Sequence, residues 1–329
     1  MHIPVRMLSA CLSARRAGMV VLGGLAMASS VACAQGFPAR NVSIIVPFAA
    51  GGSTDSTARI LAAGLADRWG KPVVVENKPG AGAVVGMELG VRAAPDGHTL
   101  TLVGNGMTQV PHLQKLSFDV VNDFAPITQI LVFDQIVVAT PAFPAKNIAE
   151  LIALAKAKPD AVNFGSTGFG GEIAMSLLES MAGFKTVHVN YGGAGPVLNA
   201  LAGGHVQVAV TDVAISEQLI KGGKIKALGL TGLTKNRLLP DVPTTAATVP
   251  GYEATGWFGL AAPGKTPRPV VDQVNRDTVA VLRSAEIRPR LEASGGTIIA
   301  NSPVEFAKII KDQFDLNAKI IREAGIKAN

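Results

Sequence analysis

Cysteine is almost absent from this chain, which has 2 cysteines among 329 residues. Both of them, Cys11 and Cys33, lie close to the N-terminus, so the rest of the chain has no disulfide, thiol nucleophile or thiolate metal site. No His-x-x-x-His or His-Glu-x-x-His spacing occurs, which leaves a zinc site without support. The fold must therefore be stabilised by burial of apolar side chains alone.

Charged residues are also few. They make up 16% of the chain and leave a net charge of +6, half of which comes from Arg6, Arg15 and Arg16. No basic run occurs, and basic residues do not alternate with aromatic ones, as they do in many nucleic-acid-binding proteins. The composition therefore argues against a nucleic-acid partner.

Residues 1–34 have the features of a secretory signal peptide. Arginines precede an apolar stretch of small residues, Met19 to Ala28, and the sequence at 32–34 fits an A-x-A cleavage site. The apolar stretch is short for a membrane span. A lipoprotein anchor on Cys33 is the alternative, although Ser30 stands where a bulky aliphatic residue is usual. We expect export to the periplasm, with cleavage near Ala34.

After the signal, predicted strands and helices alternate along the chain, which indicates an α/β fold with mainly parallel sheets flanked by helices. The length is sufficient for two domains. The apolar stretch from Ile127 to Ala139 could pass from one domain to the other. The last predicted elements are a strand from Trp257 to Ala262, a helix from Pro267 to Leu282, and a helix opened by the capping box Ser302 to Glu305.

The stretch from Val42 to Trp69 organises this pattern. An apolar, β-branched strand ends at Pro47, Gly51 and Gly52 form a tight turn, and a helix with one apolar face follows. The N–H groups at the start of such a helix have no partner within the helix, and the positive end of the helix dipole lies behind them. The turn therefore predicts an anion site, with an ordinary strand-to-helix connection as the alternative.

Glycine-rich strand-to-helix turns recur at Gly165 and Gly192. In open α/β sheets, ligands bind at the carboxyl ends of the strands. Two sets of such turns facing each other across a cleft would hold a small acid from both ends.

Two nucleotide motifs are matched only in part. The segment Gly259 to Thr266 fits the P-loop pattern by letters, but Pro263 and Pro267 each remove an N–H donor that a phosphate cradle needs. The segment Gly80 to Gly86 resembles a dinucleotide fingerprint with one glycine displaced, and the next strand lacks the ribose-binding acid. We expect no cofactor.

Candidate catalytic groups are also sparse. Ser166 lies in G-S-T-G and not in a G-x-S-x-G elbow, and the valine-flanked His188 is expected to be structural, so no nucleophile pairs with a base. Asp55 and Asp212 follow strands at turns and either cap helices or contact ligand. Three aromatic residues lie inside the same turns, where we expect them to wall a pocket: Phe48, Phe169 and Tyr191.

Taken together, the motifs resemble the solute receptors of tripartite tricarboxylate transporters, the Bug-type periplasmic binding proteins. The resemblance covers the chain after the signal in order. It is carried by VPFAAGGSTDSTARILA, VVVENKPGAGAVVG, APDGHTL, DFAPIT, PAKNIAELIALAK, VHVNYGG, GGHVQVAVTD, LPDVPTTAA and GWFGLAAPGKTP.

The resemblance implies a two-domain periplasmic-binding-protein (Venus flytrap) fold, with residues 37–131 and 258–329 in one domain and residues 132–257 in the other. It implies a receptor that holds a small organic acid between the domains, uses no catalytic residue or metal, and delivers the acid to membrane permease subunits. A monomer is expected. The implied ligand-binding residues are Phe48, Ala50, Gly51, Gly52, Ser53, Thr54, Asp55, Asn105, Ser166, Thr167, Gly168, Asn190, Tyr191 and Asp212.

The chain departs from the family pattern at the pocket. Ala49 and Ala50 replace the usual prolines, Asn190 and Gly192 replace the usual Pro and Lys around the tyrosine, and a histidine usual near residues 172–175 is absent. The ligand could therefore be a di- or tricarboxylate, an amino acid or an aromatic acid. An exported hydrolase and a sensor subunit that docks to a receptor kinase are the alternative functions.

Overall fold

The computed structural model describes residues 37–158, 161–166, 169–191, 194–293 and 295–324, so the predicted signal peptide lies outside the described residues. Residues from Arg40 onward form one compact unit, built on two separate β-sheets. Among the residues described, no helix is long and apolar enough to cross a membrane.

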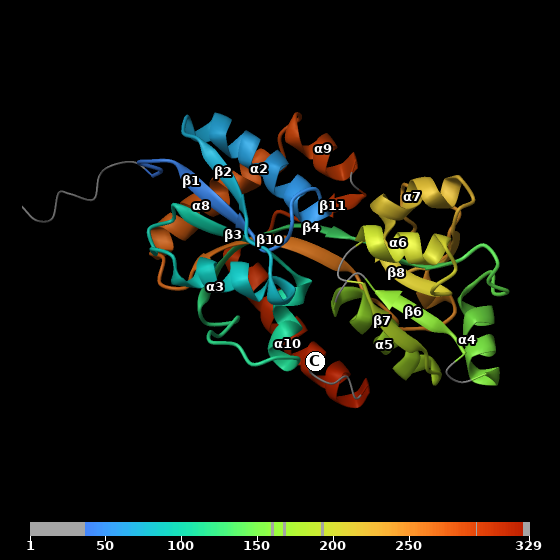
Figure 1. Ribbon diagram of the computed structural model, residues 1–329. Helices are drawn as coiled ribbons and strands as arrows, with labels where there is room; N and C mark the ends of the chain where they lie inside the picture. Colours follow the sequence, from blue (N-terminus) through green and yellow to red (C-terminus); the bar gives the residue numbers. More distant parts are fainter. Residues whose placement is uncertain (1–36, 159–160, 167–168, 192–193, 294, 325–329) are drawn as a thin grey trace, which may run out of the picture. The chain divides into compact units, whose positions relative to one another are not determined.

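The first sheet has 6 strands in the order β11-β4-β10-β3-β1-β2. Together with its helices we call it the first lobe (Figure 1). Strands β2 and β3 run parallel to β1, whereas β10 is antiparallel to β3 and β4, and β11 is antiparallel to β4. The strands are β1 (Val42–Val46), β2 (Val73–Asn77), β3 (Thr99–Gly104), β4 (Phe124–Phe133), β10 (Gly256–Pro263) and β11 (Gly296–Ile298).

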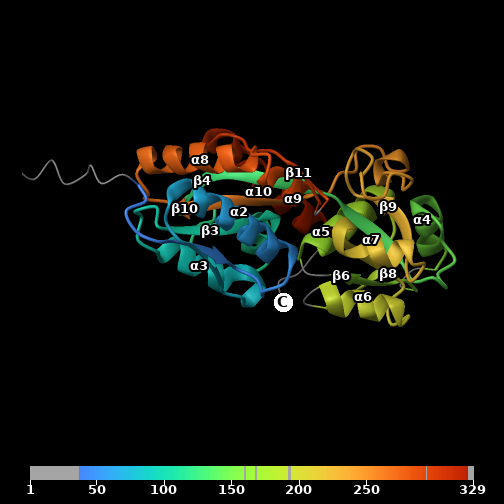
Figure 2. The same cartoon turned by 90° about the horizontal axis from the view of Figure 1, so that it is seen from above.

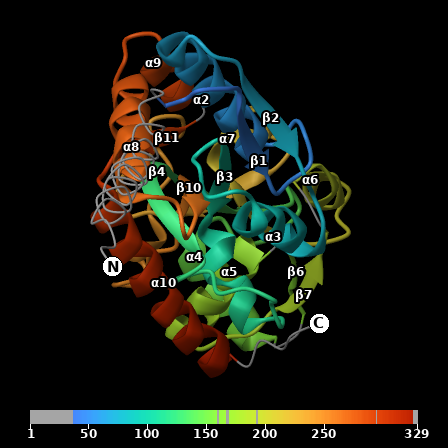
Figure 3. The same cartoon turned by 90° about the vertical axis from the view of Figure 1, so that its left-hand side faces the viewer.

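Helices cover both faces of this sheet. On one face, α3 (Val84–Arg92) and α10 (Pro303–Ala324) enclose an apolar cluster in which the Trp257 and Phe306 rings meet edge to face, 5.3 Å apart. Figures 1 and 3 show α2 (Ser53–Trp69), α8 (Arg268–Leu282) and α9 (Ile287–Ala293) together on the other face. The first lobe is thus a three-layer α/β/α arrangement.

The second sheet has 5 strands in the order β7-β6-β8-β5-β9 and, with its helices, forms the second lobe (Figure 2). Strand β6 is parallel to β7 and β8, whereas β5 is antiparallel to β8 and β9. One face packs on α4 and α5, the other on α6 and α7. The elements are β5 (Gln135–Ala139), α4 (Ile148–Ala157), β6 (Asn163–Ser166), α5 (Phe169–Ala182), β7 (Val187–Asn190), α6 (Ala194–Ala202), β8 (Val208–Asp212), α7 (Val213–Lys221) and β9 (Lys226–Leu230).

The predicted two-sheet α/β fold is confirmed: most strands of each sheet run in one direction, and the reversed strands are β10 and β11 in the first sheet and β5 in the second. The parallel strands are those joined by helices, which include β1, β2 and β3 in the first sheet and β6, β7 and β8 in the second. The antiparallel pairs involve β4, β5 and β10, which lie where the chain passes between the lobes. A strand that enters a sheet from the other lobe needs no helical crossover, so its direction is not fixed by one.

The chain crosses between the lobes at Asp134, which separates β4 from β5, and again between β9 and β10. The loops between the helices and strands contain short 3-10 turns at Ala81–Ala83, Asn105–Thr108, Val110–His112 and Thr245–Ala247. The predicted capping box is present at the start of α10, because Glu305 Oε2 accepts from the Ser302 N–H at 2.8 Å. At the start of α4, Asn147 Oδ1 accepts from the Glu150 N–H at 2.9 Å.

The C-terminal part of α10 also reaches α5 of the second lobe. There Ile320 and Ile321 join Leu113 and Ile173 in a buried apolar cluster. This cluster connects the lobes at a place other than the crossing strands.

Candidate functional site

The glycine turn after β1 has the conformation that the sequence predicts. Gly51 has a φ of +90°, which residues with a Cβ rarely adopt, and α2 begins at Ser53 with Gly52 as its N-cap. Gly52 itself has ordinary extended backbone angles, so Gly51 is the position of this pair at which the backbone conformation favours glycine. Phe48 is 42% exposed, and Ala50, Gly51 and Gly52 are exposed as well. The turn is therefore accessible.

Asp55 stabilises this turn from within the first lobe. Its Oδ2 accepts from the Gly51 N–H at 2.9 Å and from Arg59 Nε at 3.0 Å, and its Oδ1 accepts from Asn77 Nδ2 at 3.0 Å. Burial alone would raise the pKa of Asp55, but the hydrogen bonds from Arg59, Gly51 and Asn77 lower it overall. Asp55 thus bonds the residue before the N-cap Gly52, no side chain caps the helix at Gly52 itself, and the Gly51 N–H is engaged.

The N–H groups of Gly52, Ser53 and Thr54 are the donors that remain at this helix end. Within the described part of the chain, no protein oxygen accepts from them. They open α2, a helix of 17 residues, so its dipole adds to their attraction for an anion. The predicted anion site therefore has three candidate N–H donors.

On the second lobe, Ser166, His188 and Glu172 form a hydrogen-bonded chain. Ser166 Oγ lies 2.7 Å from His188 Nε2, and His188 Nδ1 lies 3.3 Å from Glu172 Oε1. The parallel register pairs Phe164 with His188, so the Ser166 and His188 side chains share one face of the sheet. The expectation that no nucleophile meets a base is wrong: the residues are separated in sequence, and only strand register brings them together.

Ser166 is completely buried, so its hydroxyl faces His188 and not solvent. The ring of His188 also stacks on Phe164 with 5.4 Å between centroids. His188 is thus held by Ser166, Glu172 and Phe164, although the residue as a whole is exposed. The Ser166 hydroxyl is engaged by His188 in this arrangement.

The remaining predicted second-lobe residues lie at the same end of the sheet. Asn190 ends β7, and the N–H of Tyr191 donates to the Ser166 carbonyl at 3.2 Å. Tyr191 is half-buried and packs on the second-lobe core, so it belongs partly to that core. Phe169 opens α5, while Thr167 and Gly168 lie outside the described residues.

Two contacts bring these residues to the first lobe. Ser53 Oγ donates to Asp212 Oδ2 across 3.4 Å, although the two residues are 159 positions apart. A Cβ placed on Gly170 would lie 3.2 Å from Asn105 Nδ2. The turn before α2 and the ends of β6 and β8 therefore face one another.

Asp212 also lines a small cavity shared by the lobes. Its volume is about 20 Å³, roughly the space of one water molecule. Burial raises the pKa of Asp212 to about 6, despite hydrogen bonds from Gln135 and Ser53 that lower it. The lining residues are Ser53, Thr57, Leu131, Phe133, Asp134, Asp212, Val213, Ala214, Phe258 and Gly295.

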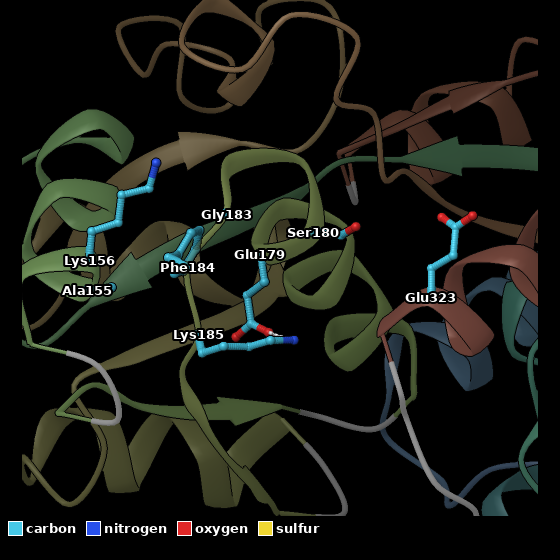
Figure 4. A pocket seen from close by; sticks show the side chains of 8 residues that line it. All are labelled: Ala155, Lys156, Glu179, Ser180, Gly183, Phe184, Lys185 and Glu323. Atoms are coloured by element: carbon cyan, nitrogen blue, oxygen red, sulfur yellow. Dashed lines mark ion pairs between the residues drawn. The ribbon is translucent and has the colours of Figure 1, made fainter.

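A larger recess, of about 480 Å³, lies away from these turns (Figure 4). In it, Lys185 is directed toward Glu179, with 3.8 Å between Nζ and Oε2, whereas Lys156 points away. The residues that line it are Ala155, Lys156, Glu179, Ser180, Gly183, Phe184, Lys185 and Glu323. None of the predicted site residues is among them, so this recess is not the candidate site.

No group of three or more His, Cys, Asp or Glu side chains is placed to hold a metal ion in the described residues. The P-loop-like segment does not form a phosphate loop. Residues up to Pro263 belong to β10, and the Gly264 N–H donates to the Asp123 carbonyl at 2.8 Å.

Comparison with known proteins decides the family. Residues 57–326 match the model of the tripartite tricarboxylate transporter family receptor. The chain belongs to this family. The resemblance drawn from the sequence motifs is thereby confirmed.

Solved structures agree with this assignment. The periplasmic binding protein BugD is 32% identical, with a TM-score of 0.79 over 88% of this chain and 99% of its own. Rpa4515 of R. palustris with adipate is 29% identical, with a TM-score of 0.81 over 88% and 99%. MatC of Rhodopseudomonas palustris with bound malate is 30% identical, with a TM-score of 0.78 over 87% and 100%. The receptor family and the periplasmic-binding-protein fold are thus shared.

Proposed function

We propose that this receptor binds a small organic acid between its two lobes and delivers it to the permease subunits of a tripartite tricarboxylate-type transporter. One carboxylate is bound by the N–H groups of Gly52, Ser53 and Thr54. The observation that carries the proposal is the start of α2, where Gly52 is exposed and Ser53 half-buried, and which faces the second lobe at Asp212. Adipate and malate in the two related structures support a carboxylate ligand.

In this proposal two domains move relative to each other, residues 37–131 with 258–329 and residues 132–257. Ligand binding shifts the population toward a closed form by movement at the two crossings. Residues 1–34 direct export to the periplasm and are removed near Ala34. The chain acts as a monomer.

The other site residues take different roles in this proposal. Asp55 holds the turn, and Ser166 positions His188. Direct contacts come from both lobes: Phe48, Ala50, Gly51, Gly52, Ser53, Thr54, Asn105, Thr167, Gly168, Asn190, Tyr191 and Asp212.

One observation favours a second function. Ser166, His188 and Glu172 have the order of contacts of a serine hydrolase triad. The complete burial of the serine hydroxyl argues against attack on a substrate in this conformation. A sensor subunit would have the same pocket and differ only in its membrane partner.

A thermal-shift screen of purified residues 35–329 tests the proposal, using mono-, di- and tricarboxylates, amino acids and aromatic acids. A ligand at a hundred times its Kd adds about 2.7 kcal/mol of stability. A stabilising acid recovered unaltered supports a receptor, and a consumed one supports the hydrolase. If no acid shifts the melting temperature, the proposed function is wrong. Capture of permease subunits or a receptor kinase from membranes distinguishes transport from sensing.

A further inference from the structure

We propose that Asp212 selects the far end of the ligand, favouring an acid whose second polar group donates a hydrogen bond, as an ammonium or hydroxyl group does. The inference rests on the proposed function, because it assumes that a carboxylate occupies the start of α2. An amino acid is the ligand that satisfies both ends best.

The position of Asp212 is the first reason. It ends β8 and lies opposite the N-terminus of α2, at 3.4 Å from Ser53 Oγ. It lines the cavity to which both lobes contribute. A ligand held at Gly52 to Thr54 by one end therefore extends toward this carboxyl group.

The surroundings of Asp212 supply few donors. Gln135, its partner across the β5–β8 pair, and Ser53 are the side chains that donate to it. An ionised carboxylate has about four acceptor sites. Asp212 can therefore accept a further hydrogen bond from a ligand once the cavity of about 20 Å³ widens to admit one, while a second ligand carboxylate would meet like charge.

No cationic side chain lines the described cavity, and its second titratable group is also acidic. Asp134, at the crossing between the lobes, accepts from Asn236 Nδ2 at 2.8 Å, and burial raises its pKa. Several charged groups on the elements around Asp212 are paired elsewhere: Asp55 with Arg59 on α2, Glu172 with His188 and Glu179 with Lys185 at α5, and Glu217 with Lys221 on α7.

When the lobes close, the Asp212 carboxylate therefore lacks a hydrogen-bond donor. Either a donor group of the ligand or a proton from solvent fills this place. Burial raises the pKa of Asp212 from 3.8 to about 6 where it meets Ser53, so an arrangement that buries this carboxyl group binds a proton more tightly than one that leaves it solvated. For a ligand without a donor, linkage makes affinity rise about tenfold from pH 7 to pH 5. An ammonium group of the ligand takes the place of the proton on Asp212, so the affinity for such a ligand should not rise as the pH falls from 7 to 5.

The test compares succinate, L-malate and L-aspartate, which share a four-carbon skeleton and carry no donor, a hydroxyl and an ammonium group. Titration calorimetry at pH 7 should give affinities in the order aspartate, malate, succinate, with at least a tenfold span. In Asp212→Asn, the span should shrink to within threefold. Asp67→Asn, which removes an exposed carboxylate of α2, is the matched control and should keep the wild-type order.

The pH arm uses the same proteins. The affinity for succinate should rise about tenfold more in wild type than in Asp212→Asn between pH 7 and pH 5, since the titration of succinate itself is common to both. Equal affinities for the three acids in wild type, or an unchanged span in Asp212→Asn, would overturn the inference while leaving the receptor function intact. The wild-type comparison holds even if the variant does not fold. If none of the acids in the wider screen binds, the proposed function fails instead.

Discussion

Replacing Gly52 with proline tests the backbone anion site directly. The substitution removes one of the three N–H groups proposed to bind the ligand carboxylate. Gly52 has a φ of −82°, close to the value that proline imposes, and no helical hydrogen bond depends on its N–H. The unliganded protein should therefore fold with a melting temperature near that of wild type.

The size of the effect follows from the bond that is lost. A hydrogen bond to a charged group contributes about 1.5–3 kcal/mol, which corresponds to a loss of affinity of roughly tenfold to a hundredfold. Gly52→Ala is the matched control, because it keeps the N–H group and its Cβ would meet nothing closer than the Ala49 carbonyl, at 4.0 Å.

Titration calorimetry with the most stabilising acid from the screen measures both variants. We expect Gly52→Pro to bind weakly and Gly52→Ala to bind nearly as wild type does. Wild-type affinity in Gly52→Pro would refute the role of this N–H group. An equal loss in both variants would mean that the ligand approaches the Cα of Gly52 too closely for any side chain.

Two further predictions concern stability. Asp55→Asn removes the carboxylate charge that accepts hydrogen bonds from Gly51 and Arg59. Because the folded-state pKa of Asp55 is lowered, the carboxylate's contribution to the free energy of unfolding is present above pH 3.8 and is lost as the pH falls further. The melting temperatures of wild type and variant should therefore converge in acid. A constant difference down to pH 2 would contradict this. Gly259→Ala should destabilise by about 1–3 kcal/mol in urea, since its Cβ would lie 2.2 Å from the buried Phe306 ring. Gly195→Ala, whose Cβ meets nothing within 4 Å, is the control. Equal urea midpoints of unfolding for the two variants would contradict the prediction and would mean that the sheet shifts to accommodate the added methyl group.

Features that depend on neighbouring residues could be predicted from the sequence. The glycine at φ +90°, the capping box at Ser302 and the apolar strand runs each depend on residues within a few positions, so the start of α2 and most helices and strands were predicted from sequence. The three-residue β11 and the short α9 were not predicted between Leu282 and Ser302. Segments of that length give too little periodicity to recognise.

The candidate site also has a part that the sequence predicts and a part that depends on the tertiary structure. The sequence by itself determined the turn at Gly51 and the N–H groups that open α2, because glycine conformation and helix ends are local properties. Only the tertiary structure decided that Ser166 bonds His188, that Asp212 faces Ser53, and that the sheets are mixed. These features depend on strand register and on how the chain crosses between lobes, which join residues up to 159 positions apart and leave no periodic trace in the sequence.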